Sequence, residues 1–167
     1  TKLENFKKIN WRSNSDTEVL LNLYKYYLDS CQGLNKFFQS LNGIFSIAIW
    51  DASKRELILA RDSFGVKPLY SYKIKNGFFF ASEIKALLPY LNNFKEKSIL
   101  KNKFEELDLR AIERYLTYLW CPGNSTPSKE IKKIEPGSFL RIKNGEITEE
   151  NNWNKLPSLS FVYKKDR

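Results

Sequence analysis

The chain has 167 residues, enough for one domain with a sizeable core, and its 42% hydrophobic and 15% aromatic content excludes a disordered chain. Its net charge of +9 comes from lysines spread along the sequence, which indicates a solvated basic surface and no nucleic-acid partner. No apolar run approaches the roughly 20 residues that span a bilayer and no secretory signal opens the sequence, so we expect a cytoplasmic protein without a membrane partner.

The first predicted helix covers about residues 17–30 and follows four residues that all favour helix caps, Ser13-Asn14-Ser15-Asp16. Gly33 breaks its pattern, and a second short helix is expected over residues 34–41. The first helix should bury a stripe of apolar residues at helical spacing. These are Val19, Leu20, Leu23, Tyr24, Tyr27 and Leu28.

Four short apolar runs come next, each ended by turn residues, and they predict strands over residues 44–50, 57–60, 69–74 and 78–81. Their near-continuous apolar character indicates burial on both faces, so we expect these strands in the middle of a layered fold. Asn76-Gly77 predicts a tight hairpin between the last two strands, because both residues tolerate positive φ.

Two more helices are predicted after the strands. Ser82 can cap a helix over residues 83–88 that Pro89 helps to end. Its apolar residues, Ile84, Leu87 and Leu88, should face inward. Residues 92–106 are polar and rich in lysine, which predicts a loop. Asp108 can then cap a helix over residues 109–119 with an apolar side made of Ile112, Tyr115, Leu116 and Leu119.

The last predicted elements are a strand over residues 138–142, a turn at Asn144-Gly145 and a shorter strand over residues 146–148. The tail from Leu156 has the composition of a linker. The chain contains no histidine, which excludes Ser-His-Asp and Cys-His catalysis and His-ligated metal centres.

Two cysteines remain, Cys31 and Cys121, and they share no CxxC spacing. We therefore expect no metal site and two reduced, structural thiols. Enzymes that use a terminal α-amine as the base need no imidazole and are not excluded. Thr1 is a poor candidate for their nucleophile, because polar, helix-like residues follow it instead of a buried strand.

Several motifs in fixed order resemble the glutaminase domain of asparagine synthetases, which are class II glutamine amidotransferases. They are SNSDTEVLLNLY from Ser13, LNGIFSIAIWD from Leu41, ARDSFGVKPLYSY from Ala60, FFFASEIKAL from Phe78 and IEPGSFLRIKNGEI from Ile134. Together they cover roughly Trp11 to Trp153, and their common order makes the resemblance specific. It implies an α+β fold, the four-layer αββα sandwich of N-terminal-nucleophile hydrolases, incomplete at the N-terminus. Residues 1–155 would be the C-terminal portion of a glutamine amidotransferase type 2 domain, and residues 156–167 a linker toward a synthetase domain.

Asp16, together with Ser15, is the best candidate for contacting a substrate. A carboxylate near helix-terminal amides is held in place and could pair with the α-ammonium of an amino acid. In the family that SNSD resembles, the matching aspartate grips the backbone of glutamine, so the resemblance implies glutamine as the substrate. The alternative is that Asp16 only caps the next helix, and both roles could coexist because a carboxylate has several acceptor sites.

Arg61 and Asp62 open the most distinctive string, which is similar to the family's RD-x-x-G-x-x-PLY element. They can fix a tight loop through hydrogen bonds and partial ion pairing, while Gly65 permits positive φ and Pro68 sets φ for the next strand. We expect this string to shape the floor of the glutaminase site and the route by which ammonia leaves. An anion-binding loop is the alternative, but the Gly-rich pattern of phosphate cradles is missing. The predicted site-shaping residues are Arg61, Asp62, Gly65, Lys67, Pro68, Tyr70, Ser82 and Glu83.

Ser82-Glu83 matches an SE pair in the family, and the resemblance implies a role at the interface with a synthetase domain. Glu83 at a helix start is also favoured by the helix dipole alone. The family's nucleophile is an N-terminal cysteine whose thiol attacks the glutamine amide, and neither Cys31 nor Cys121 matches its position. Counterparts of the family's RHRGPD-like stretch, NGEIYN-like oxyanion segment and SGGLDS motif are missing as well.

The chain therefore resembles the second half of a glutaminase domain, cut at both ends, and the absence of methionine even at position 1 fits a fragment. We expect no catalytic residue in it, no activity of the fragment alone, and exposed edges that favour homo-oligomers or partner binding. The implied parent is a glutamine-dependent asparagine synthetase that hydrolyses glutamine and amidates aspartate. Its expected partners are glutamine, the missing N-terminal segment and the synthetase domain, where ATP and Mg²⁺ would bind.

Three alternatives stay open. A related amidotransferase could act on another carboxylate, such as a sugar acid or a peptide. The chain could instead be a non-catalytic binding module. It could also bind nucleic acid through aromatic residues that stack on bases, although aromatic residues beside apolar runs more often belong to a core.

Overall fold

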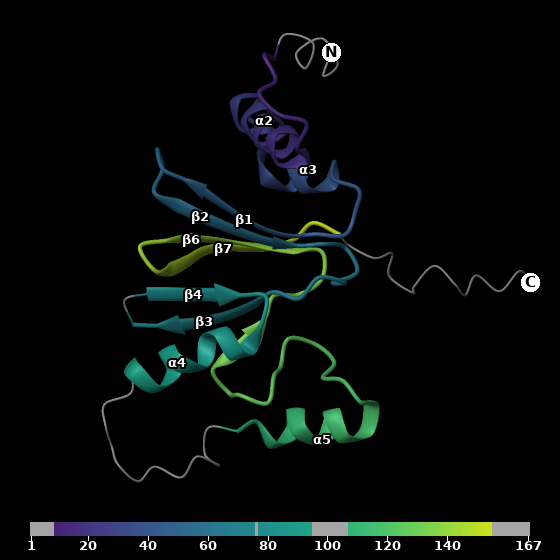
Figure 1. Cartoon of the computed structure of the whole chain (residues 1–167), viewed down its shortest axis with the longest axis vertical. Helices are drawn as coiled ribbons and strands as arrows, with labels where there is room; N and C mark the ends of the chain where they lie inside the picture. The colour runs from purple at the N-terminus through teal and green to yellow at the C-terminus, as the bar shows by residue number, and fades with distance from the viewer. Residues whose placement is uncertain (1–8, 76, 95–106, 155–167) are drawn as a thin grey trace, which may run out of the picture. The chain divides into compact units, whose positions relative to one another are not determined.

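The computed structural model describes residues 9–75, 77–94 and 107–154 (Figure 1). The chain divides into two compact units, Thr1–Asn42 and Gly43–Arg167. In the described residues, the first unit is helical and the second contains two antiparallel sheets and helices, so the predicted α+β class is confirmed. The predicted linker over residues 156–167 lies outside the described residues.

Helices α2 (Asp16–Asp29) and α3 (Gly33–Gln39) form the first unit. Ser15 caps α2, because its side-chain oxygen accepts a hydrogen bond from the backbone N–H of Thr17 at 3.2 Å. Gly33 has a φ of 76°, a left-handed conformation that glycine adopts without the strain it causes in other residues. Both predicted helices are confirmed within two residues of their expected bounds.

Aromatic rings join the two helices of the first unit. Tyr24 and Tyr27 meet the ring of Phe37 edge-on, at centroid distances of 5.7 and 6.2 Å. Leu34 and Phe38 of α3 are buried beside them. The predicted stripe is therefore partly right, because its tyrosines are buried but Val19 is exposed.

The second unit contains two sheets. Strands β1 (Ser46–Asp51), β2 (Glu56–Arg61), β6 (Ser138–Lys143) and β7 (Glu146–Asn152) form the first sheet, in the order β1-β2-β6-β7. Strands β3 (Tyr70–Ile74), β4 (Gly77–Ala81) and β5 (Ile131–Lys133) form the second, in the order β4-β3-β5. All neighbouring strands are antiparallel.

The two sheets lie as adjacent layers with an apolar core between them (Figure 1). Leu57 and Leu59 of β2 share one face of their strand, because side chains two residues apart point the same way. Both contribute to this core. The core cluster consists of Leu59, Leu69, Ile134, Leu140 and Ile142, with Leu57 and Phe78 packed against it.

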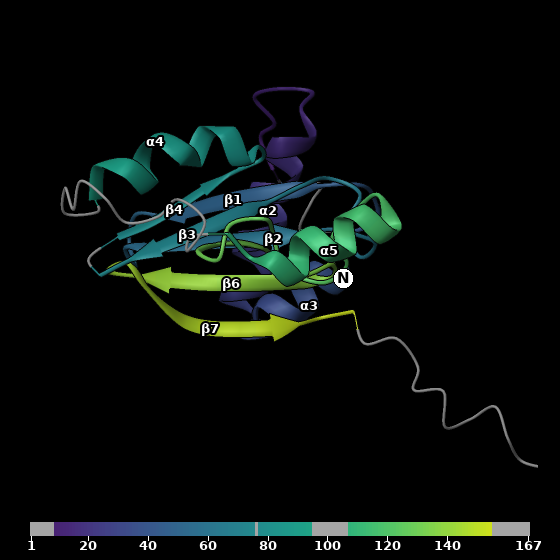
Figure 2. The ribbon, with the colours of Figure 1, turned by 90° about the horizontal axis from the view of Figure 1, so that it is seen from below.

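Helix α4 (Ile84–Phe94) covers the outer face of the second sheet (Figure 2). Its Leu87 is buried against Tyr72 of β3 and Ile131 of β5. Leu88, which we expected to face inward, is exposed. The apolar face of this helix is therefore narrower than the sequence predicted.

The prediction that Pro89 ends this helix is wrong, because Pro89 lies inside α4. A proline there removes one backbone hydrogen bond. Beyond it, the ring of Tyr90 stacks on Phe79 of the sheet at a centroid distance of 4.7 Å. This contact holds the helix on the sheet past the proline. Residues 92–94, predicted to begin a loop, belong to the helix too, and residues 95–106 lie outside the described residues.

Helix α5 (Leu109–Tyr118) begins at the predicted cap, where the Asp108 carboxylate accepts a hydrogen bond from the backbone N–H of Ala111 at 3.1 Å. It ends at Leu119, whose φ of 61° is left-handed. Ala111 is its buried residue. Of the apolar side that the sequence predicted for this helix, Ile112 is half-buried, whereas Tyr115, Leu116 and Leu119 are exposed.

The expectation that all four apolar runs are buried on both faces is wrong for the two runs that form β1 and β4. Among the described strands, β1 and β4 are edges, and Trp50 of β1 and Phe80 of β4 are exposed. An apolar run indicates that a strand is buried somewhere along its length, but it does not reveal the strand order. Strand β5 has only three residues, too few to form a pattern that predicts it.

The predicted hairpins are confirmed with one shift. Asn144 and Gly145 both have positive φ, as a two-residue turn between β6 and β7 requires. Strand β7 then runs to Asn152, beyond the predicted end at residue 148. In the other hairpin Ile74 pairs with Gly77, so that glycine lies in the strand, and Asn76 is outside the described residues. No helix in the described part of the chain has the length and apolar character needed to cross a membrane.

Candidate functional site

Asp16 is the first residue of α2, and its side chain is exposed. Ser15 caps α2 instead. The helix-capping role that we considered as the alternative for Asp16 is therefore performed by Ser15. Among the described residues, no hydrogen bond or ion pair engages the Asp16 carboxylate. This exposed carboxylate lies at the N-terminus of α2, the positive end of the helix dipole.

Glu18 fixes the segment that leads into α2. Its carboxylate accepts hydrogen bonds from the backbone N–H groups of Arg12 and Ser13 at 2.9 and 2.8 Å, and from the Ser13 hydroxyl at 2.7 Å. The Ser13 hydroxyl, followed by the Arg12 N–H, holds the pKa of Glu18 below its ordinary value of 4.5. Glu18 thus fixes the residues before the helix, a role that Asp16 does not share within the described part of the chain.

A hollow of about 600 Å³ opens beside the start of α2. Ser15 and Thr17 line it, but Asp16 does not. Most of the residues that line it are polar, and they include both signs of charge, from Glu18, Arg12 and Lys25. Its lining residues are Ile9, Asn10, Arg12, Ser13, Ser15, Thr17, Glu18, Leu21, Asn22 and Lys25.

Asp62 organises the loop that follows β2 in the second unit. Its carboxylate is 1% exposed and accepts backbone hydrogen bonds, each 3.1 Å long, from Phe64, Val66 and Lys67. Burial alone would raise the pKa of Asp62, but the N–H groups of Lys67, Val66 and Phe64 outweigh it and hold the pKa below 3.8. The loop is therefore wrapped around one ionised, buried carboxylate.

Arg61 braces the same loop from the other side. Its guanidinium donates to the backbone carbonyls of Lys67 at 2.7 Å and Ile134 at 2.9 Å, and also to that of Gly65. Burial lowers the pKa of Arg61, and the neighbouring Asp62 opposes this shift. The predicted hydrogen-bonded loop is confirmed, but in the described residues Arg61 and Asp62 bond to backbone groups instead of forming a direct ion pair.

Gly65 is required where the loop passes closest to Arg61. Its φ is 65°, and a Cβ there would lie 2.8 Å from Cγ of Pro136 and 3.0 Å from Cζ of Arg61. Both the left-handed backbone and the lack of space therefore exclude a side chain. Among the other residues that we predicted to shape the site in this loop, Tyr70 lines a pocket. It is the first residue of β3.

Replacing Gly65 with alanine should lower the free energy of unfolding by about 3 kcal/mol, because the strain of positive φ adds to the clash with Pro136. Gly123→Ala is the matched control, since Gly123 has a φ of 73° but a Cβ there would have no neighbour within 4 Å. That control should lose only about 1 kcal/mol. Urea denaturation of both variants measures the difference, and equal losses would contradict the crowding we describe.

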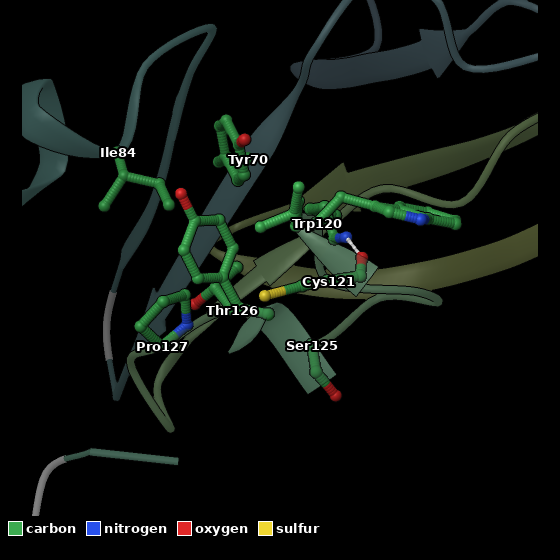
Figure 3. Close-up of a pocket in the computed structure, with 10 residues that line it drawn as sticks. Tyr70, Ile84, Trp120, Cys121, Ser125, Thr126 and Pro127 are labelled. Carbon is green, nitrogen blue, oxygen red and sulfur yellow. Dashed lines mark hydrogen bonds between the residues drawn. The ribbon is translucent and has the colours of Figure 1, made fainter. Parts of the chain in front are cut away.

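A second pocket, of about 400 Å³, lies in the second unit between Tyr70 and the segment that follows α5 (Figure 3). Lys133 is one of its lining residues, with Nζ 5.8 Å from the centre of the Trp120 ring, and donates a hydrogen bond to the carbonyl of Cys121. Burial lowers the pKa of Lys133. The lining residues are Tyr70, Ile84, Tyr115, Leu119, Trp120, Cys121, Ser125, Thr126, Pro127 and Lys133.

The predicted site residues thus fall into two groups. Ser15 and Asp16 belong to the first unit, whereas Arg61, Asp62, Gly65, Lys67, Pro68, Tyr70, Ser82 and Glu83 belong to the second. Tyr70 and Ile84 both line the second pocket. Ser82 and Glu83, which come directly before Ile84 in the sequence, are exposed. A common pocket formed by Asp16 and the Arg61–Tyr70 loop stays a prediction.

Sequence reasoning missed two supports of these sites. Glu18 follows Ser15 by three residues, the spacing of a capping box, but it bonds to Arg12 and Ser13 and not to the Ser15 N–H that a capping box would engage, so the spacing points to the residue and not to its partners. The backbone carbonyl of Ile134 accepts a hydrogen bond from Arg61, which is far away in the sequence. No local pattern could have revealed that contact.

Comparisons with known proteins agree with the motifs. The profile of a family described as glutamine amidotransferase domain matches residues 1–153. Glutamine-hydrolyzing asparagine synthetase 1 of Bacillus subtilis (strain 168) is 35% identical over 143 residues, 85% of this chain and 20% of that protein. Glutamine-hydrolyzing asparagine synthetase 3 of the same organism is 45% identical over 145 residues, 84% of this chain and 20% of that protein. The chain therefore spans about a fifth of the length of these relatives.

Proposed function

Since this chain belongs to the glutamine amidotransferase domain family, we propose that it is part of a glutamine-dependent asparagine synthetase. The observation that carries the proposal is the family match over residues 1–153. The parent would hydrolyse glutamine to glutamate and ammonia, and the ammonia would amidate aspartate. The names of the relatives reported above favour aspartate over a sugar acid or a peptide as the acceptor.

Asp16 would bind the α-ammonium group of glutamine in this proposal. This role for Asp16 is supported by the contacts at the start of α2, where Ser15 caps the helix and Glu18 holds the preceding segment. The Asp16 carboxylate is then left exposed at the positive end of a helix. A charge-assisted bond to an ammonium group would use this arrangement directly.

The nucleophile would come from outside these 167 residues. Cys31 is exposed at the end of α2 and Cys121 is half-buried after α5. Neither is an N-terminal residue whose own amine could act as the base. The Arg61–Tyr70 loop would shape the floor of the site and the exit of ammonia, and its support is the network around Asp62.

For the fold we propose the four-layer αββα sandwich of N-terminal-nucleophile hydrolases. The stacked sheets and the cover of α4 support three of its layers, and the fourth would be helical. ATP and Mg²⁺ would bind in a synthetase domain outside these residues. We also propose a cytoplasmic protein that can form homo-oligomers.

Activity assays test the proposal at two levels. The full-length protein should release glutamate from glutamine and form asparagine only when aspartate, ATP and Mg²⁺ are present. The 167-residue polypeptide should release no glutamate above a buffer blank, because in this proposal the attacking thiol and oxyanion donors would come from outside these residues. A full-length protein without glutaminase activity would refute the family function, whereas activity of the short polypeptide would refute only its proposed dependence on missing residues.

A further inference from the structure

Lys133 is the one charged residue among the described residues that line the pocket of about 400 Å³ (Figure 3). The other lining residues are uncharged, and Tyr115, Leu119 and Trp120 form an apolar and aromatic wall. Pockets that bind small molecules typically occupy about 300–1,000 Å³ and have apolar walls with a few polar groups that fix the orientation of the ligand. This pocket has that composition, and its volume lies in the lower part of that range.

The ammonium group of Lys133 has no acidic partner in the part of the chain that the structure describes, where none of the ion pairs includes it. It donates a hydrogen bond to the backbone carbonyl of Cys121, and the centre of the Trp120 ring lies 5.8 Å from Nζ. An ammonium group carries more donors than this one bond uses. Lys133 can therefore still donate to an anion.

The surroundings of Lys133 favour a negative ligand. Burial lowers the pKa of Lys133, the Cys121 thiol opposes this shift, and the positive charge of Arg61 adds to it. An anion beside Nζ would stabilise the charged form of the lysine and offset the cost of burying it.

The other buried polar groups of the pocket already have partners. The Thr126 hydroxyl lies 2.9 Å from the carbonyl of Ser128 and 2.8 Å from that of Ile131. The Cys121 thiol donates to the carbonyl of Ala111 at 3.4 Å. These groups offer little to a polar ligand, whereas the aromatic and aliphatic wall offers contact to an apolar one.

We propose that this pocket binds a small organic carboxylate whose body is aromatic or branched aliphatic. The carboxylate would accept a charge-assisted hydrogen bond from Nζ of Lys133, and the body would pack against Tyr115, Leu119 and Trp120. A single lysine favours a singly charged group over a phosphate, whose additional charge would stay unpaired in a partly buried site. The inference goes beyond the proposed function and does not rest on it, because residues of this chain alone form the pocket.

Saturation-transfer NMR with phenylacetate as the probe, titrated into the full-length protein, tests this site. The affinity should fall about tenfold in Lys133→Met, which removes the charge but keeps an unbranched apolar stem. Phenylacetamide, the uncharged analogue, should bind the wild type about tenfold more weakly than phenylacetate for the same reason.

Lys132→Met is the matched control. Lys132 is the neighbouring residue of β5, is exposed and does not line the pocket. Its replacement changes the net charge by the same amount and should leave the affinity for phenylacetate unchanged. Trp120→Ala is a second pocket variant that does not depend on the Lys133 hydrogen bond. Trp120 is 59% exposed, so the variant should fold, and the loss of an aromatic wall should weaken binding about fivefold.

Three results would overturn the proposal. They are no binding of phenylacetate to the wild type, equal affinities for phenylacetate and phenylacetamide, and equal affinities of the wild type and a folded pocket variant. Glutamate and aspartate, carboxylates with polar bodies, should not displace the probe, and displacement by them would also contradict the apolar specificity. Glutamate release from glutamine by the same samples, measured separately, reports on the proposed function, so the two ideas can fail independently.

Discussion

Replacing Asp62 with alanine should lower the free energy of unfolding of the second unit by about 3 kcal/mol. The substitution removes the acceptor of three backbone N–H groups from a buried position. Hydrogen bonds to a charged acceptor contribute about 1.5–3 kcal/mol each, and part of this is recovered when the freed N–H groups meet water. Urea denaturation followed by circular dichroism measures the loss.

The effect of Asp62 should depend on pH in a defined direction. The pKa of Asp62 is lower in the folded protein than its ordinary value of 3.8. Its ionised form therefore stabilises the protein above that value, and this contribution disappears as pH falls through the lower folded pKa. The difference between wild type and Asp62→Asn should be constant near neutral pH and should shrink below about pH 4.

Asp51→Asn is the matched control for Asp62. The Asp51 carboxylate also accepts backbone hydrogen bonds in a turn, from Ser53 at 3.1 Å and Lys54 at 3.2 Å. Asparagine forms the same type of turn, so this variant should lose less than about 1 kcal/mol. If both variants lost the same stability at every pH, the special role of the Asp62 carboxylate would be disproved.

Asp16→Asn should raise the KM for glutamine of the full-length protein about 100-fold, with a smaller change in kcat. The substitution removes the charge that we propose to pair with the substrate ammonium, and such charge-assisted bonds contribute about 2–3 kcal/mol. Asparagine synthesis from added ammonia should be unchanged, because it bypasses glutamine. Stability should change by less than about 0.5 kcal/mol, since the carboxylate is exposed and interacts favourably with the helix dipole.

Asp29→Asn provides the control for this kinetic prediction. Asp29 is the last residue of the same helix and is exposed like Asp16. Its replacement should leave the KM for glutamine unchanged. An equal rise in KM for both variants, or a loss of ammonia-dependent synthesis in Asp16→Asn, would show that the helix as a whole had been disturbed.

Local chemistry made much of this structure predictable. Capping residues predicted where α2 and α5 begin, because Ser15 and Asp108 accept hydrogen bonds from helix N–H groups only a few residues away. The Asn144-Gly145 turn and the positive φ of Gly65 follow from the residue types alone. Each of these features depends on neighbours in the sequence, which is why residue order was enough.

Features that depend on distant contacts were not predictable in the same way. Helix α4 continues through Pro89 because Tyr90 reaches Phe79, and only the folded chain brings those rings together. The apolar side of α5 was recognised from its spacing, yet spacing cannot say whether a side faces its own domain or a partner. For the candidate site, the sequence indicated the loop after β2 but not its anchor at Ile134.

The short link between β5 and β6 has a consequence for how the second unit comes apart. Only the residues from Ile134 to Gly137 separate a strand of one sheet from a strand of the other. Ile134 accepts from Arg61, and the N–H of Gly137 donates to the Asp62 carbonyl at 2.8 Å. The same hydrogen bonds therefore connect both sheets, so the second unit should unfold in a single cooperative transition. Local motions that admit a ligand should occur in segments away from the residues between β5 and β6.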